Sequence, residues 1–171
     1  MSKKKTIVQP ELKGELQKIF SDNRDFFSNG NLRIGRLRDE AMSYFSENGF
    51  PSHKLEAWRS TNIIDDLKKD FSVLLNPDFR EIDTEKLFQC EVPDFDTDLY
   101  KQLNGFYVDR NKPLTKYDNG VIVGSLRAAF QEYPELVERH YGRYADYRKS
   151  GLVALNTAMT RDGIFIYVPD N

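Results

Sequence analysis

The side chains that most often carry nucleophilic or metal chemistry are scarce in this chain, which has one cysteine and two histidines in 171 residues. Cys90 stands alone, and neither His53 nor His140 lies at a metal-ligand spacing from it. A thiol nucleophile needs a base beside it, and nothing in the local sequence brings either histidine to Cys90. We therefore expect Cys90 to be a small, partly buried apolar side chain. We expect no catalytic residue, no metal site and no bound cofactor.

Motifs for nucleotide and hydrolytic chemistry are also missing from the sequence. It has no Gly-x-x-x-x-Gly-Lys-Ser/Thr loop to hold phosphates, no Gly-x-Ser-x-Gly and no His-Glu-x-x-His. We therefore expect a protein that is not an enzyme.

One run combines basic and aromatic side chains: RHYGRYADYRK, residues Arg139–Lys149. Such a strip could stack bases and contact phosphates, so a nucleic-acid-binding module is an alternative function. Asp146 interrupts the run, and the whole chain has a net charge of −2, which gives no general attraction to nucleic acid. The other interpretation is a loop whose tyrosines cover the domain while its cations are solvated.

A second candidate surface surrounds Trp58, the only tryptophan, in the segment GFPSHKLEAWRSTN, residues 49–62. Trp58 is either an exposed anchor for a partner protein or a core residue that holds a short helix against its neighbours. Lys54, Glu56 and Arg59 have the spacing of a charged surface set. These four residues are our candidate partner-binding site.

The elements that must position these residues begin with helices. Apolar residues recur at helical spacing in two stripes: Leu12, Leu16, Ile19, Phe20 and Phe27, then Ile34, Leu37, Ala41, Tyr44 and Phe45. Asn29–Asn31 is a short loop between them, and Gly49 followed by Pro51 ends the second helix. Ser52 can cap a third helix that runs toward Trp58, and Ser60 or Thr61 a fourth.

The character of the sequence changes near Leu99. Asn104-Gly105 between apolar segments predicts a tight hairpin, because both turn positions need a positive φ. A strand at 120–123, a helix capped by Ser125, a helix that starts at Pro134 and a helix around 148–160 follow. Asp162-Gly163 then turns into a strand at 164–168 that is apolar on both faces and expects cover on each.

Composition indicates a soluble globular protein, with 39% hydrophobic and 30% charged residues. The acidic stretch Asp78–Asp98 is interpreted as a solvated connector. We therefore predict an α+β fold, with a helical N-terminal domain at 1–98 and a small α/β unit at 99–171. The single cysteine fits a reducing compartment, and without a long apolar run a cytoplasmic protein is expected.

Four segments in order carry a family resemblance. The segment GFPSHKLEAWRSTN is similar to the GFP-x-x-K-x-E-x-W-(K/R)-x-T signature of the SufB and SufD family of iron–sulfur cluster assembly proteins. GVIV at 120–123, PELV at 134–137 and LNTAMTRDGIFIYVPDN at 155–171 resemble later family segments. The order and spacing are more similar to SufD members than to SufB members, over roughly residues 33–171.

The resemblance implies a larger parent protein, in which the last strand enters a right-handed β-helix that is missing here. It implies a non-catalytic scaffold of the SufBCD complex, with SufB and SufC as partners through the full-length protein and sulfur-donor proteins as further candidates. The iron–sulfur cluster would be the product of that complex, since such clusters need about four ligands, mostly thiolates. We also expect the uncovered strand at 164–168 to expose apolar surface and to promote self-association.

Overall fold

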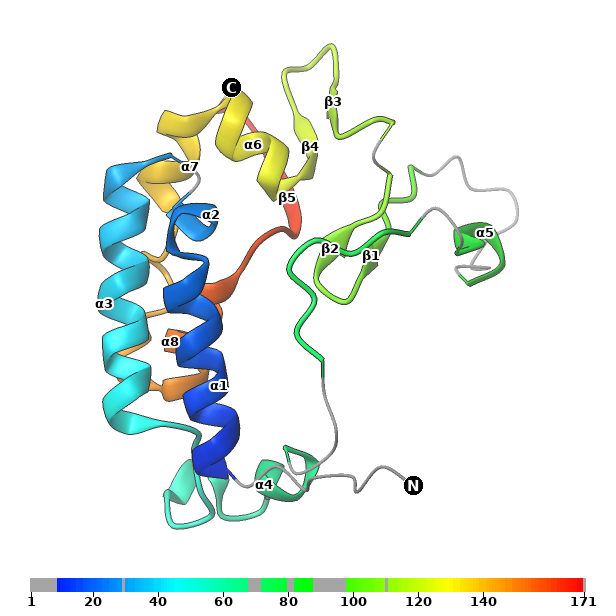
Figure 1. Cartoon of the computed structure of the whole chain (residues 1–171). Coiled ribbons are helices and arrows are strands. Elements are labelled where there is room, and N and C mark those ends of the chain that lie inside the picture. The colour runs from blue at the N-terminus through cyan, green and yellow to red at the C-terminus, as the bar shows by residue number, and fades with distance from the viewer. Residues whose placement is uncertain are drawn as a thin grey trace. The chain divides into compact units, whose positions relative to one another are not determined.

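The computed structural model describes residues 9–28, 30–67, 72–79, 82–87, 98–109 and 111–170. Helices and small antiparallel sheets make up these residues, which confirms the predicted α+β class (Figure 1). The helices are α1 (Gln9–Asp22), α2 (Arg24–Ser28), α3 (Leu32–Asn48), η1 (Glu56–Trp58), α4 (Ile63–Asp66), α5 (Thr84–Leu87), α6 (Leu126–Glu132), α7 (Pro134–His140), η2 (Tyr147–Lys149) and α8 (Gly151–Met159). The strands are β1 (Gln102–Leu103), β2 (Phe106–Tyr107), β3 (Leu114–Lys116), β4 (Ile122–Ser125) and β5 (Ile164–Tyr167).

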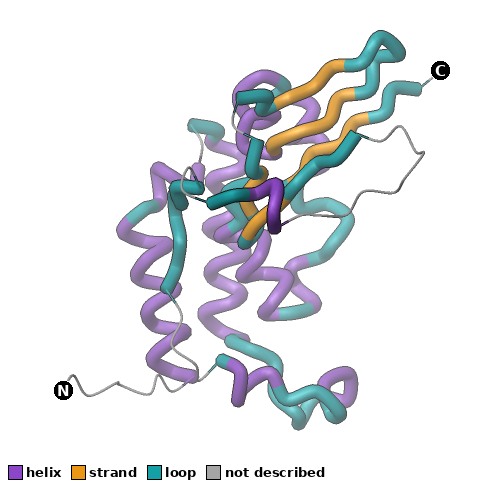
Figure 2. Tube along the Cα trace, turned by 90° about the vertical axis from the view of Figure 1, so that its right-hand side faces the viewer, coloured by secondary structure: helices purple, strands orange, loops and turns teal. Residues whose placement is uncertain are grey.

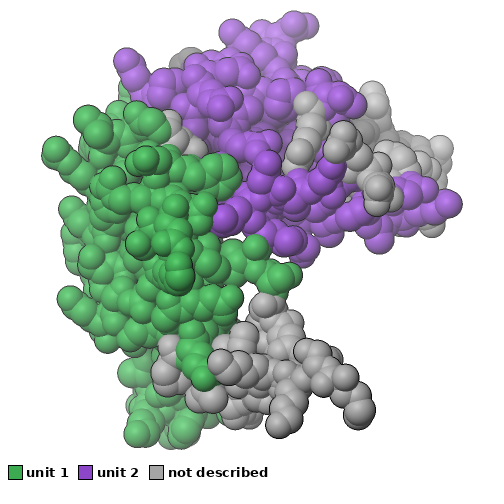
Figure 3. All heavy atoms as spheres, viewed as in Figure 1, with its two compact units in different colours: residues 1–73, 138–160 green, residues 74–137, 161–171 purple. Residues whose placement is uncertain are grey.

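The chain divides into two compact units (Figure 3). Unit 1 contains residues 1–73 and 138–160, and unit 2 contains residues 74–137 and 161–171. The grouping therefore does not follow the linear division at residue 98 that we expected from sequence. It differs because α8, far along the chain, packs on α3.

The front of unit 1 follows the expected apolar stripe, but in two helices rather than one. Phe20 and Phe27 are buried, and their rings stack at 5.3 Å between centroids. The helix breaks at Asn23, whose side-chain Nδ2 donates to the Ile19 carbonyl at 2.8 Å. The asparagine side chain thus competes with the helical backbone N–H groups for a carbonyl acceptor, and a second helix, α2, begins at Arg24.

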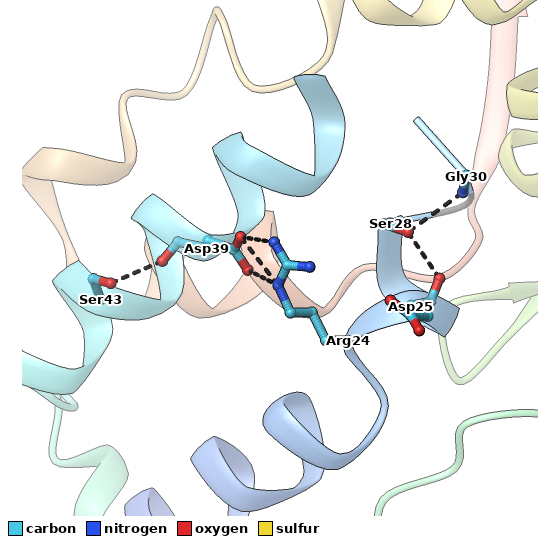
Figure 4. Close-up of polar contacts among 6 residues, drawn as sticks. All are labelled: Arg24, Asp25, Ser28, Gly30, Asp39 and Ser43. Carbon is cyan, nitrogen blue, oxygen red and sulfur yellow. Dashed lines mark hydrogen bonds and ion pairs between the residues drawn. The ribbon is translucent and has the colours of Figure 1, made fainter. Parts of the chain in front are cut away.

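Polar contacts fix the passage from α2 into α3 (Figure 4). The Arg24 guanidinium binds both carboxylate oxygens of Asp39, and this raises the pKa of Arg24. Asn31 caps α3, because its Oδ1 accepts from the backbone N–H groups of Arg33 and Ile34, both at 3.0 Å.

Gly49 ends α3 as predicted, with φ at 64° and its N–H donating to the Phe45 carbonyl at 2.7 Å. The prediction of a helix between Ser52 and Trp58 is wrong, because the structure has the single 3₁₀ turn η1 there. Leu55 has the N-cap position of η1 without a side-chain bond, and the Ser52 hydroxyl accepts only from the N–H of Lys54 at 3.4 Å.

Close packing of α3 against α8 forms the centre of unit 1. Ala154 and Ala158 are fully buried, and a Cβ on Gly151 would lie 1.8 Å from the Gly49 carbonyl oxygen. Arg38 is also fully buried. Its Nη1 donates to the Ala158 carbonyl at 3.3 Å, and its Cζ lies 5.1 Å from the centre of the Tyr141 ring. Burial lowers the pKa of Arg38. A cation at the C-terminal end of α8 complements that helix dipole.

Unit 2 contains the predicted hairpin and a three-stranded antiparallel sheet in the order β3-β4-β5, whose strands lie side by side in Figure 2. Asn104 and Gly105 have φ of 48° and 82°, as the turn between β1 and β2 requires. Sequence analysis did not predict β3. The Ser125 hydroxyl accepts from the Ala128 N–H at 3.1 Å, which confirms this residue as the cap of α6.

Candidate functional site

The four candidate partner-binding residues lie together on one short surface segment of unit 1. Trp58 is half-buried, whereas Lys54, Glu56 and Arg59 are exposed. Neither sequence alternative for Trp58 holds in full, since the ring is not a core residue and not fully exposed. The partner-binding role of these four residues stays a prediction.

Consecutive turns hold this segment in place. The N–H of Leu55 donates to the Ser52 carbonyl at 3.0 Å, that of Trp58 to Leu55 at 2.9 Å, and that of Thr61 to Trp58 at 3.1 Å. In the described ranges, the side chains of Lys54, Glu56 and Arg59 form no ion pair. The segment therefore presents a half-buried aromatic ring beside exposed charges of both signs, a combination that occurs at protein–protein interfaces.

The basic-aromatic strip 139–149 does not form a platform for stacking. The Tyr141 hydroxyl donates to the Thr157 carbonyl at 2.7 Å. Tyr147 is buried, and its hydroxyl donates to the Glu40 carboxylate at 2.7 Å. Tyr144 is exposed, but its ring stacks on His140 and its hydroxyl bonds that imidazole. The tyrosines thus serve packing within unit 1, and no observation favours the nucleic-acid alternative over the covering-loop interpretation.

Sequence reasoning missed a buried polar group of unit 2 that accepts four hydrogen bonds, the carboxylate of Asp162, and treated Asp162-Gly163 only as a turn. The side chain is 6% exposed. Oδ1 accepts from the Ser125 hydroxyl at 2.8 Å and from the backbone N–H groups of Arg127 at 3.1 Å and Gly163 at 2.9 Å. Oδ2 accepts from the Tyr107 N–H at 3.2 Å. The carboxylate therefore joins β2, β4 and the first turn of α6 to the start of β5. These four donors belong to the fold itself, which indicates a structural role for the carboxylate.

The last strand presents the surface that the alternation of its side chains predicted. Phe165 and Tyr167 are half-covered, whereas Ile164, Ile166 and Val168 are 37%, 64% and 66% exposed. β5 pairs with β4 on one side and is an edge of its sheet. An apolar face on an edge strand is a site for contact with further protein.

Three residues were considered for metal chemistry, and the structure describes two of them, the histidines. Cys90 lies outside the described residues, and His53 and His140 are both exposed. In the described part of the chain, no group of three His, Cys, Asp or Glu side chains could hold a metal ion. None of the helices that the structure describes is long and apolar enough to cross a bilayer.

Comparison with known proteins shows the family to which this chain belongs. The family pattern of the SufBD protein N-terminal region matches residues 11–171. The chain belongs to this family. The match spans nearly all described elements, from α1 to β5, and extends the resemblance seen in sequence toward the N-terminus.

Curated relatives match over shorter stretches, and they are named as iron–sulfur cluster assembly proteins. The SufBD family protein ABCI9 of Arabidopsis thaliana is 38% identical over 64 residues, which cover 37% of this chain and 13% of that protein. The SufBD family protein ycf24 of Trieres chinensis is 44% identical over 50 residues, 29% of this chain and 10% of that protein. The Synechocystis protein slr0074 is 36% identical over 52 residues, 30% of this chain and 11% of that protein. No solved structure matches the chain.

Proposed function

We propose that this chain is the N-terminal interaction region of a SufD-type subunit in a SufBCD iron–sulfur assembly complex. In this proposal it is not an enzyme, it holds no cluster itself, and it works in the cytoplasm. The observation that carries the proposal is the family match over residues 11–171. Assembly of clusters is stated in the names of relatives that share 10–13% of their length with this chain, so the activity of a whole SufBD protein comes to it only as a proposal.

The proposed mechanism is scaffolding through two surfaces. In unit 2, the exposed apolar face of β5 would cover the open end of a β-helix, where strand edges and apolar side chains need protection from water. In unit 1, the half-buried Trp58 and its charged neighbours would recruit SufB, SufC or a sulfur-donor protein. The cluster would be the product of the complex rather than a ligand of this chain.

Co-purification tests this proposal. The tagged chain is mixed with SufB, SufC and a sulfur-donor protein, each in turn, and retained partners are quantified. We expect at least one of them to be retained, and the variant Trp58→Ala to lose it. Tyr144→Ala is the matched control, because it removes an exposed aromatic ring elsewhere in unit 1. Retention of none of these proteins, or equal retention by both variants, contradicts the recruitment role.

A further inference from the structure

A groove of about 280 Å³ in unit 1 lies where the first turns of α3 face the loop after α7. Its lining combines aliphatic and aromatic side chains with charged ones: Arg33, Ile34, Arg36, Leu37, Glu40, Glu138, Tyr141, Gly142 and Arg143. The groove is separate from the segment around Trp58 and from β5, the two surfaces used by the proposed function.

The positive charges around this groove outnumber the negative ones, with Arg33, Arg36 and Arg143 against Glu40 and Glu138. Both carboxylates already have partners, since Glu138 lies 3.9 Å from Arg33, and Glu40 accepts from the Tyr147 hydroxyl and lies 3.7 Å from Arg148. Within the ranges that the structure describes, Arg36 and Arg143 form no ion pair. With respect to the described residues, these two exposed guanidinium groups of the lining are therefore available to a ligand, and this favours a ligand with carboxylates.

A glycine is required to build the groove. Gly142 has φ at 70°, and a Cβ there would lie 2.6 Å from Cδ2 of Leu37. Because Gly142 has no side chain, the loop can approach α3 closely. Arg143 is the next residue of the loop, and the half-buried Leu37 of α3 forms an aliphatic part of the lining.

We propose that this groove docks an acidic segment of a partner protein, in which an apolar side chain enters against Leu37 while neighbouring carboxylates pair with Arg36 and Arg143. A peptide fits this lining better than a nucleic acid does. Tyr141, the aromatic side chain of the lining, is engaged in packing through its bond to the Thr157 carbonyl, so its ring is not available for stacking with bases.

Fluorescence anisotropy with the whole chain tests the docking site. The probe is a short fluorescein-labelled peptide of leucine, glutamate and aspartate, and its neutral counterpart carries glutamine and asparagine instead. We expect the acidic peptide to bind more tightly than the neutral one, and its affinity to fall as salt is raised. The double variant Arg36→Gln/Arg143→Gln should weaken binding about tenfold, as expected for the loss of two exposed ion pairs.

Arg139→Gln is the matched control, because this exposed arginine belongs to the same strip but does not line the groove. It should retain the affinity of the unmodified chain. Equal binding of both peptides, equal weakening by the control and the double variant, or complete displacement of the peptide by a single-stranded oligonucleotide of the same charge would overturn the proposal. Circular dichroism melting of each variant shows that the fold is intact. This outcome is independent of the co-purification test, which addresses a different surface.

Discussion

Two single residues set how segments of this chain approach one another. Asp162 gathers four donors in unit 2, and Gly151 permits contact between backbones in unit 1. Both are buried, and neither belongs to the exposed side chains assigned to partners. At this scale the architecture depends on one satisfied charge and one absent side chain, and both dependences can be tested by substitution.

Asp162→Ala should lower the free energy of unfolding of unit 2 by about 3 kcal/mol, because it leaves the buried Tyr107 N–H and Ser125 hydroxyl without their acceptor. Asp162→Asn should cost less, since Oδ1 is retained and only the pairing with Tyr107 becomes donor against donor. Urea unfolding measures both changes. Asp170→Ala, at an exposed aspartate, is the control and should stay within about 0.5 kcal/mol of the unmodified chain. A loss in Asp162→Ala no larger than in the control would refute the structural role.

Substitution of two helical glycines by alanine should have opposite effects. Gly151→Ala places a Cβ 1.8 Å from the Gly49 carbonyl, so the backbone must move, at a cost of roughly 3 kcal/mol. Gly14→Ala in α1 meets nothing within 4 Å and should raise stability by roughly 0.5–1 kcal/mol through helix propensity. Thermal melting compares the two. Effects of the same sign and size would show that α3 and α8 do not pack this closely.

The phenol of Tyr141 makes unit 1 sensitive to alkali. Burial raises its pKa above the usual 10.0. The unfolded chain therefore releases this proton first, so the stability contribution is complete below pH 10 and is lost as pH rises through the raised pKa. Tyr141→Phe should lose about 1 kcal/mol at neutral pH with the bond to the Thr157 carbonyl, yet its stability should fall less steeply above pH 10. Parallel stability curves for the two proteins above pH 10 would contradict this cause.

At the scale of elements, the sequence predicted those with local chemical signals. The Asn104-Gly105 turn, the Ser125 cap, the Gly49 helix end and the alternating strand β5 each depend on residues adjacent in sequence, and all four are confirmed. The third helix was wrong because Ser52 accepts only a local backbone N–H, and the following residues form successive turns.

Elements and sites defined by long-range contacts were not predictable in this way. β3 is a short strand held by pairing with β4, as between Thr115 and Val123. The Asn119-Gly120 turn between the two strands, with φ of 83° at Gly120, was a local signal that the sequence analysis did not use. The acceptor role of Asp162 requires donors from residues 107, 125 and 127, which only the folded chain brings together. The groove beside Arg36 likewise needs Arg143, distant in sequence, so neither residue alone signalled a site.

Self-association is the prediction that belongs to β5. The exposed side chains of Ile166 on the edge strand and of Val168 directly after it should let two copies associate, and a hydrophobic dye should bind there. Ile166→Lys should give a monomer with reduced dye fluorescence in analytical ultracentrifugation and dye titration. Leu32→Lys, which places the same charge at an 82% exposed leucine of α3, should leave association unchanged. A strictly monomeric unmodified chain without dye binding would contradict the prediction.

At the scale of the whole molecule, the chain is a member of the SufBD N-terminal family whose two units each carry a surface suited to protein contact. In unit 1 the surface is the segment around Trp58, and in unit 2 it is the apolar face of β5. The described residues show packing and capping, and the proposed scaffold role assigns partner contact to the exposed side chains of these two surfaces.

The measurement that tests this role most directly is hydrogen exchange of the chain, alone and mixed with SufB, followed by mass spectrometry of peptides. The account predicts slower exchange on mixing at residues 53–61 or 164–168, with α1 unchanged as the internal control. Unchanged exchange across both segments, or protection confined to α1 and the rest of the molecule, would contradict the claim that these surfaces recruit and cover partners in cluster assembly.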